Sequence, residues 1–167
     1  MPEKTNVSRI LDRLKIKYDL VEYKVDPEHL EASHVAEELG EDIATVYKTL
    51  VLRGDKNGVF VCVVRGDREV DLKKAAKVSG NKKVSMIALK ELLPLTGYIR
   101  GGCTSIGMKK KYPVFIDNKA FELPFIYVSA GRRGLQIKLD PNDLIKAANG
   151  VQADISTETE GEETENT

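Results

Sequence analysis

The sequence is poor in the residues that form disulfides and bind metals. Its two cysteines, Cys62 and Cys103, are too few for a disulfide framework, and its two histidines, His29 and His34, match no metal-binding spacing. We interpret both cysteines as reduced thiols. The sequence therefore predicts a protein without a metal site and without a cofactor.

Long hydrophobic runs are also missing. No stretch approaches the roughly 18 apolar residues of a membrane span, and residues 1–6 lack the basic-then-apolar layout of a signal peptide. We therefore expect no membrane partner and a cytoplasmic location.

Proline and glycine are scarce in a chain whose composition is otherwise balanced. The 167 residues include 6 prolines and 13 glycines, and 41% of the residues are hydrophobic and 31% charged. This composition is typical of a globular protein, not of a disordered, collagen-like or coiled-coil chain. The length suits one domain and excludes a large multidomain machine.

The formal net charge is zero, but the charge is unevenly distributed. Residues 156–167 contain five glutamates and no lysine or arginine, so residues 1–155 carry a net charge of +5. A segment this acidic and this poor in apolar residues does not bury enough surface to offset its ordering entropy. We therefore predict one domain over 1–155 and a disordered acidic tail over 156–167. The mildly basic domain is compatible with a polyanionic partner.

Local signals predict helices interleaved with short strands. Asp71 and Asp140 are suited to capping helices, Pro141 to a first helical turn, and Gly40 and Gly80 to helix ends. The predicted helices are 7–14, 33–39 with Ser33 as its cap, 72–78, 87–93 ended by Pro94, and 141–148. The predicted strands are 18–23, 46–52, 59–64, 113–116, 125–128 and 135–139, with the second and third joined as a hairpin at the centre of the sheet. We predict a mixed α/β domain with a largely antiparallel sheet surrounded by helices.

Two loops are candidates for binding an anion. The glycine-rich segment 101–107 resembles a nucleotide-triphosphate loop, but Lys109 stands one residue too late and no Ser or Thr follows it. It is either a plain tight turn or a nest whose backbone N–H groups hold an anion or an oxyanion. The loop 129–134 carries Arg132 and Arg133, which either hold an RNA backbone or a terminal ribose or are solvated in a hairpin turn.

Lysine and cysteine supply the remaining candidates for chemistry. Lys48 interrupts the apolar pattern of the strand 46–52, and it either snorkels at the sheet edge or points into a cleft. Cys62 lies within a buried-looking strand. Cys103 lies in the glycine loop, but the sequence places no base near it, so neither cysteine is convincing as a nucleophile.

Four segments stand out when they are taken together: 46–50 (VYKTL), 71–74 (DLKK), 96–107 with TGY and GGCTSIG, and 129–134 (SAGRRG). In order and spacing they closely resemble the YbaK/EbsC family of Cys-tRNA(Pro) deacylases, which are related to the editing domain of bacterial prolyl-tRNA synthetase. The resemblance runs from Val7 to Ala148 and implies the fold of that family.

The resemblance implies a trans-editing enzyme that removes cysteine wrongly attached to tRNA(Pro). Cysteine is close to proline in size, so a synthetase pocket does not exclude it by sterics and a second sieve is required. In the family, the thiol of the bound cysteine attacks its own ester carbonyl. Carried onto this chain, the resemblance assigns catalysis to Lys48 and Gly101, and substrate binding to Tyr23, Thr49, Gly102, Cys103, Ser129, Gly131, Arg132 and Gln136.

Two positions depart from the family pattern. Gln136 stands where some relatives carry aspartate, and Ser105 stands where the loop commonly has proline, so a charged contact becomes an amide and the loop is less rigid. Two alternatives remain: a deacylase for another small aminoacyl-tRNA such as Ala-tRNA, and a tRNA- or synthetase-binding module without catalysis. The implied partners are mischarged tRNA and prolyl-tRNA synthetase.

Overall fold

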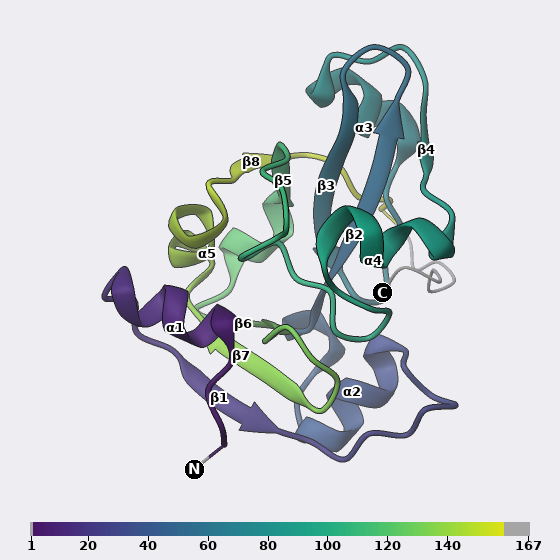
Figure 1. Cartoon of the computed structure of the whole chain (residues 1–167). Helices are drawn as coiled ribbons and strands as arrows, with labels where there is room; N and C mark the ends of the chain where they lie inside the picture. Colours follow the sequence, from purple (N-terminus) through teal and green to yellow (C-terminus); the bar gives the residue numbers. More distant parts are fainter. Residues whose placement is uncertain (1, 159–167) are drawn as a thin grey trace.

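Two β-sheets enclose the main core of the protein (Figure 1). The computed structural model describes residues 2–158. The strands are β1 (Asp19–Glu22), β2 (Tyr47–Gly54), β3 (Gly58–Arg65), β4 (Val84–Met86), β5 (Val114–Asp117), β6 (Ile126–Ser129), β7 (Leu135–Leu139) and β8 (Val151–Ala153). The helices are α1 (Asn6–Arg13), α2 (Ala32–Leu39), α3 (Leu72–Ser79), α4 (Leu92–Thr96) and α5 (Pro141–Ala148), with 3-10 turns at Ile43–Thr45, Leu89–Glu91 and Asn118–Glu122.

The strand pairings confirm a mixed α/β fold that is largely antiparallel. One sheet has the order β4-β2-β3-β5-β8 and the other the order β1-β7-β6. Pairing is parallel between β3 and β5 and between β5 and β8, and antiparallel between the other neighbours. The hairpin of β2 and β3 is central to its sheet, as predicted. The division into two sheets was not predicted, because it depends on β1 pairing with β7 from the other end of the chain.

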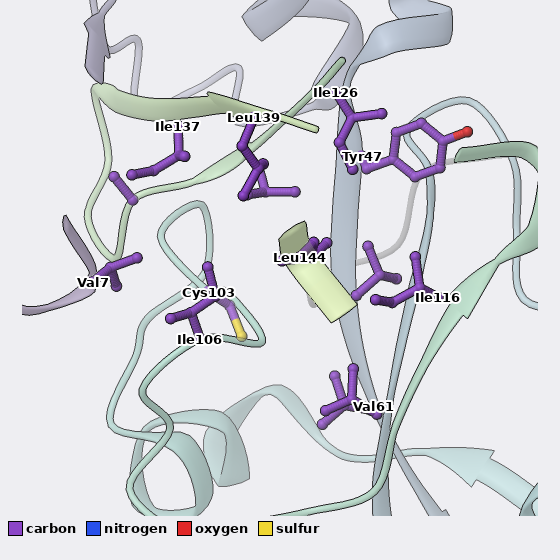
Figure 2. Packing of buried hydrophobic residues seen from close by; sticks show 14 of the residues in the cluster. Val7, Tyr47, Val61, Cys103, Ile106, Ile116, Ile126, Ile137, Leu139 and Leu144 are labelled. Carbon is purple, nitrogen blue, oxygen red and sulfur yellow. The ribbon is translucent and has the colours of Figure 1, made fainter. Parts of the chain in front are cut away.

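The core between the sheets is built from residues that alternate along the strands. Val61 of β3, Ile116 of β5 and Ile137 and Leu139 of β7 belong to one buried cluster, and Leu144 of α5 lies in the middle of it (Figure 2). Residues two apart along a strand share a face, so the other residues of β3 lie on the opposite face of the sheet. A second cluster there packs α3 against the sheet and includes Phe60, Cys62, Val64, Ala75 and Ile155. Cys62 is a fully buried core residue, and this burial raises the pKa of its thiol.

Helix ends follow the local signals with two exceptions. Asp71 and Asp140 cap α3 and α5, as predicted. α2 begins at Ala32 after Glu31, which makes no side-chain capping bond, so Ser33 is not the cap.

No helix within residues 2–158 is long and apolar enough to span a membrane.

The predicted helix 87–93, ended by Pro94, is wrong. A 3-10 turn covers Leu89–Glu91, α4 follows at Leu92–Thr96, and the helix ends at Gly97 with φ +85°. Pro94 lies in the first turn of α4, where the backbone N–H groups have no intrahelical acceptor, so proline does not break the helix there.

The domain extends beyond residue 155, which corrects the predicted boundary. Ser156 is fully buried and forms an isolated antiparallel β-bridge with Val70. The N–H of Thr157 donates to the carbonyl of Glu69. The buried carboxylate of Asp117 accepts from the N–H groups of residues 155 and 156, at 3.1 and 3.0 Å. The predicted tail therefore starts inside the fold. Residues 159–167 lie outside the described residues, so their disorder remains a prediction.

Asp117→Ala is expected to destabilise the protein. The substitution removes the acceptor of two buried N–H groups and of the N–H of Lys119. The expected cost is about 3 kcal/mol, because buried unpaired donors keep their desolvation penalty, and this corresponds to a melting temperature about 6 to 12 °C lower. Asp154→Ala, which removes an exposed carboxylate that pairs with Lys74, is the matched control. Equal melting temperatures for the two variants would contradict this role.

Candidate active site

A narrow cleft opens where the two sheets meet. The parallel bridge between Val46 and Tyr127 brings the start of β2 against β6, and α2 covers this junction. The cleft has a volume of about 30 Å³, which is room for one or two water molecules. It is lined by Leu30, Ala32, Val35, Val46, Tyr47, Lys48, Thr49, Gly101, Cys103, Ser129 and Gln136.

The structure brings most of the predicted site residues together here, from three separate parts of the chain. Lys48 and Thr49 come from β2, and the glycine loop and the β6–β7 hairpin supply the rest. The predicted residues that line the cleft are Lys48, Thr49, Gly101, Cys103, Ser129 and Gln136. Those outside its lining are Tyr23, Gly102, Gly131 and Arg132.

Lys48 is buried and does not snorkel at the sheet edge. In the antiparallel register it lies opposite Val64 of β3, and only 3% of its surface is exposed. Its neighbours in the cleft are otherwise uncharged, so it is the one ionic side chain among the lining residues of the described chain. A cation in this low-dielectric setting interacts strongly with negative charge that develops beside it.

The glycine loop packs directly against the arginine loop of the β6–β7 hairpin. Gly101 has φ +85°, and a Cβ there would lie 3.2 Å from Cγ of Arg133. Nε of Arg133 donates to the carbonyl of Arg100 at 2.8 Å. Arg133 therefore holds the glycine loop in place, while Arg132 is exposed and its guanidinium donates to the carbonyl of Arg133.

Gly102 has a structural task in this loop. Its N–H donates to the carbonyl of Ile99 at 3.0 Å, and a Cβ would lie 3.0 Å from Cα of Arg132. Because its N–H group already donates to Ile99, Gly102 is not a candidate donor to an oxyanion. The close approach explains why glycine is required at this position.

The Cys103 thiol is poorly suited to be a nucleophile. It is 4% exposed and packs beside Ile106 in the core (Figure 2), and burial raises its pKa to about 12. Neither a histidine nor a carboxylate lines the cleft in the described chain. His29 and His34 lie outside the lining, with ring centroids 5.8 Å apart and ring planes tilted by 36°. No group of three His, Cys, Asp or Glu residues within 2–158 is arranged to hold a metal ion.

Ser129 of β6 and Gln136 of β7 are opposite each other in the strand register, and both line the cleft. Oγ of Ser129 accepts from the N–H of Gly131 at 3.2 Å. Oε1 of Gln136 is buried and has no hydrogen-bond partner among the described residues. A buried amide oxygen without a partner is costly, so this atom is suited to accept from a bound ligand.

The apolar wall of the cleft was missed by sequence reasoning. Leu30, Ala32, Val35 and Val46 line it, and the buried hydroxyl of Tyr47 has no hydrogen-bond partner among residues 2–158. Burial, with Asp117 nearby, raises the pKa of Tyr47. Amphipathic spacing in α2 marks Ala32 and Val35 as core. Only the fold shows which part of that core faces the cleft.

Comparisons with known proteins agree with this geometry. The family model of the aminoacyl-tRNA editing domain matches residues 26–147. EbsC of Enterococcus faecalis, a candidate Cys-tRNA(Pro)/Cys-tRNA(Cys) deacylase, is 47% identical over 155 residues, which cover 93% of this chain and 94% of EbsC. A proline–tRNA ligase of Cupriavidus necator is 32% identical over 94 residues, 54% of this chain and 16% of the ligase.

Solved structures show the same fold. The crystal structure of a candidate trans-editing enzyme for prolyl-tRNA synthetase matches with a TM-score of 0.77 at 22% identity, over 93% of this chain and 99% of that one. The resemblance predicted from the four motifs is confirmed by the family model and by the identity with EbsC. The chain belongs to the family of aminoacyl-tRNA editing domains, which are enzymes that remove wrongly attached amino acids from tRNA.

Proposed function

We propose that the protein is a trans-editing deacylase that removes cysteine from mischarged tRNA(Pro). The observation that carries the proposal is the composition of the cleft: one buried cation, Lys48, beside a glycine loop, with a protein thiol whose pKa is too high for it to act near neutral pH. Among the described residues, no histidine or carboxylate lines the cleft to activate the hydroxyls of Thr49 and Ser129 or the Cys103 thiol, and such a cleft suits a substrate that brings its own nucleophile. Cysteinyl-tRNA does so through its thiol.

The reaction then proceeds within the substrate. The cysteine sulfur attacks the carbonyl carbon of its own ester, a C–S bond forms, and the bond from the carbonyl carbon to the ribose oxygen breaks. The thiol proton ends on the departing ribose oxygen. The product is a cyclic cysteine thiolactone, which water opens to free cysteine. The protein supplies orientation and electrostatic stabilisation in this scheme.

Four of the cleft residues have a place in this scheme. The ammonium of Lys48 interacts with the charge that develops at the ester or with the terminal adenosine, and backbone groups around Gly101 hold the carbonyl. Oε1 of Gln136, which lacks a partner, accepts from the amino group of the substrate. The cleft of about 30 Å³ is smaller than a cysteinyl group, so we infer that Leu30, which packs against Gly101, moves aside on binding.

The decisive experiment is deacylation of purified Cys-tRNA(Pro), run beside Ala-tRNA(Pro) and Pro-tRNA(Pro). Fast loss of cysteine is expected, with alanine and proline released at close to their spontaneous rates, because neither carries a thiol. Equal rates for cysteine and alanine would point to water as the nucleophile and to a broader deacylase. Absence of activity on all three would favour the binding module without catalysis.

Prolyl-tRNA synthetase is the partner that this proposal implies. The 32% identity with part of a proline–tRNA ligase supports a link, because a separate editing domain must meet the tRNA that the synthetase has mischarged. The proposal also places the protein in the cytoplasm, where tRNA is charged. Addition of the synthetase to the deacylation assay tests the link, since a complex would lower KM for Cys-tRNA(Pro).

A further inference from the structure

Two surface grooves include residues from the end of the glycine loop in their lining. The first, of about 250 Å³, is lined by Thr5, Asn6, Val7, Thr96, Gly97, Tyr98, Gly107, Lys109, Ala130 and Gly131. The second, of about 400 Å³, is lined by Ser105, Gly107, Met108, Lys110, Lys111, Tyr112, Val114, Lys146, Ala147, Ala148 and Asn149. Together they form what we call the basic groove.

The basic groove begins close to the cleft along the chain. Its two halves share Gly107, and Gly131 in the first half lies two residues after Ser129 of the cleft. Gly107 lies four residues after Cys103, so their Cα atoms are at most about 14 Å apart. A chain whose end occupies the cleft would therefore enter the groove after a short step.

The charge in the groove is of one sign. No Asp or Glu lines either half in the described chain, whereas Lys109, Lys110, Lys111 and Lys146 do. The first three are exposed and form no ion pair with any described residue, and Lys146 pairs with Asp143 at 3.8 Å. An open groove with several unneutralised ammonium groups attracts a polyanion.

The aromatic residues of the groove are held in fixed positions. The hydroxyl of Tyr98 donates to the carbonyl of Ile106 at 2.6 Å, and that of Tyr112 donates to the carbonyl of Leu95 at 2.8 Å. The first half combines the half-buried ring of Tyr98 with one lysine, Lys109, and the second half combines that of Tyr112 with three lysines. Lysines beside aromatic rings are the usual combination in sites for single-stranded nucleic acid.

We propose that the basic groove binds the phosphates of the tRNA strand that leads from the aminoacyl ester, namely the unpaired 3′ end and the first phosphates of the acceptor stem. This inference rests on the proposed function, because the ester in the cleft fixes where the strand begins. The proposal gives a role to the three consecutive lysines 109–111. The nucleotide-triphosphate loop does not explain them, because its lysine would stand one residue earlier than Lys109. Phosphate contacts of this kind fix the register of the RNA and carry no base specificity.

The test measures the binding of uncharged tRNA(Pro) to the full chain at several salt concentrations. In the variant with Lys109→Ala, Lys110→Ala and Lys111→Ala, affinity at low salt is expected to fall about tenfold or more, because three phosphate contacts are lost. The slope of log K against log salt is expected to become shallower by about 2, at roughly 0.7 for each contact with a single strand.

The matched control removes three lysines elsewhere. Lys77 of α3, and Lys82 and Lys83 beside the β2–β3 turn, are also exposed, and the backbone of the last two is held by Asp55. Their replacement by alanine is expected to change affinity less than twofold. The variant with Lys109→Arg, Lys110→Arg and Lys111→Arg is expected to bind like the wild type, since it keeps the charge.

The outcomes separate the groove from the activity. An equal loss in the two alanine variants, or an unchanged salt slope in the 109–111 variant, overturns the basic groove as the tRNA site. If the triple variant lacks cooperative thermal unfolding, Lys110→Ala and Lys111→Ala alone decide the question by the same comparison. Binding of uncharged tRNA does not need the reaction, so wild-type protein that binds tRNA through the groove but fails to deacylate Cys-tRNA(Pro) refutes only the proposed function.

Discussion

Lys48→Ala is expected to slow the deacylation of Cys-tRNA(Pro) about a hundredfold, because a charge-assisted contact of roughly 2 to 3 kcal/mol is lost. Lys48 is buried in the cleft and is the one ionic residue of its lining within the described chain. Its ammonium therefore acts where solvent screening is weak. Single-turnover rates at saturating enzyme give the loss in the chemical step, and a melting curve reports on the fold.

A second variant separates charge from packing. Lys48→Met keeps most of the buried stem and removes only the charge, so a comparable loss in both variants assigns the effect to the ammonium. Arg53→Ala is the matched control, because it removes a cation from the same strand, where Arg53 pairs with Glu91 away from the cleft. Activity near wild type in a folded Lys48→Met protein would show that the charge does not contribute.

Local signals were sufficient for most helices and strands. Asp71 with Gly80, and Asp140 with Pro141, mark helix boundaries because caps and end residues act on the nearest turns of backbone. The hairpin of β2 and β3 was equally clear, since its apolar runs flank a turn. These features do not depend on distant parts of the chain, so the sequence predicts them.

The failures have physical causes. β4 and β8 are three residues long, too short for an alternating pattern, and exist because an outer strand pairs with an inner one. The end of the domain was placed too early because Ser156 reads as part of a polar tail. Its burial depends on Asp117, which lies 39 residues earlier.

The site could be predicted in part. Lys48 was recognisable as a cation in an apolar strand, and the family motifs located the two loops. The sequence alone did not decide between a snorkelling and a cleft-facing Lys48, because the answer depends on the bridge between Val46 and Tyr127. The sequence also did not show that Arg133, rather than Arg132, holds the glycine loop, because this depends on a hydrogen bond to the distant carbonyl of Arg100.

A substrate thiol and a protein thiol predict different outcomes for Cys103→Ala. If the substrate supplies the nucleophile, the variant is expected to keep activity within about tenfold, since only a small buried side chain is trimmed. Ser-tRNA(Pro) is then expected to react about a thousandfold more slowly than Cys-tRNA(Pro), because a hydroxyl is hardly ionised near neutral pH whereas a thiol is partly ionised. Single-turnover deacylation of both substrates by wild type and variant provides the comparison.

The pH dependence gives an independent readout. With the substrate thiol as nucleophile, the enzymatic rate is expected to rise with pH and level off above about pH 9, once a thiol of ordinary pKa is ionised. Burial raises the pKa of the Cys103 thiol to about 12, so attack by Cys103 would keep accelerating through that range. A rapid quench should also yield the cysteine thiolactone by mass spectrometry. An inactive but folded Cys103→Ala protein, together with a cysteinyl-enzyme trapped in the wild type, would instead make Cys103 the nucleophile.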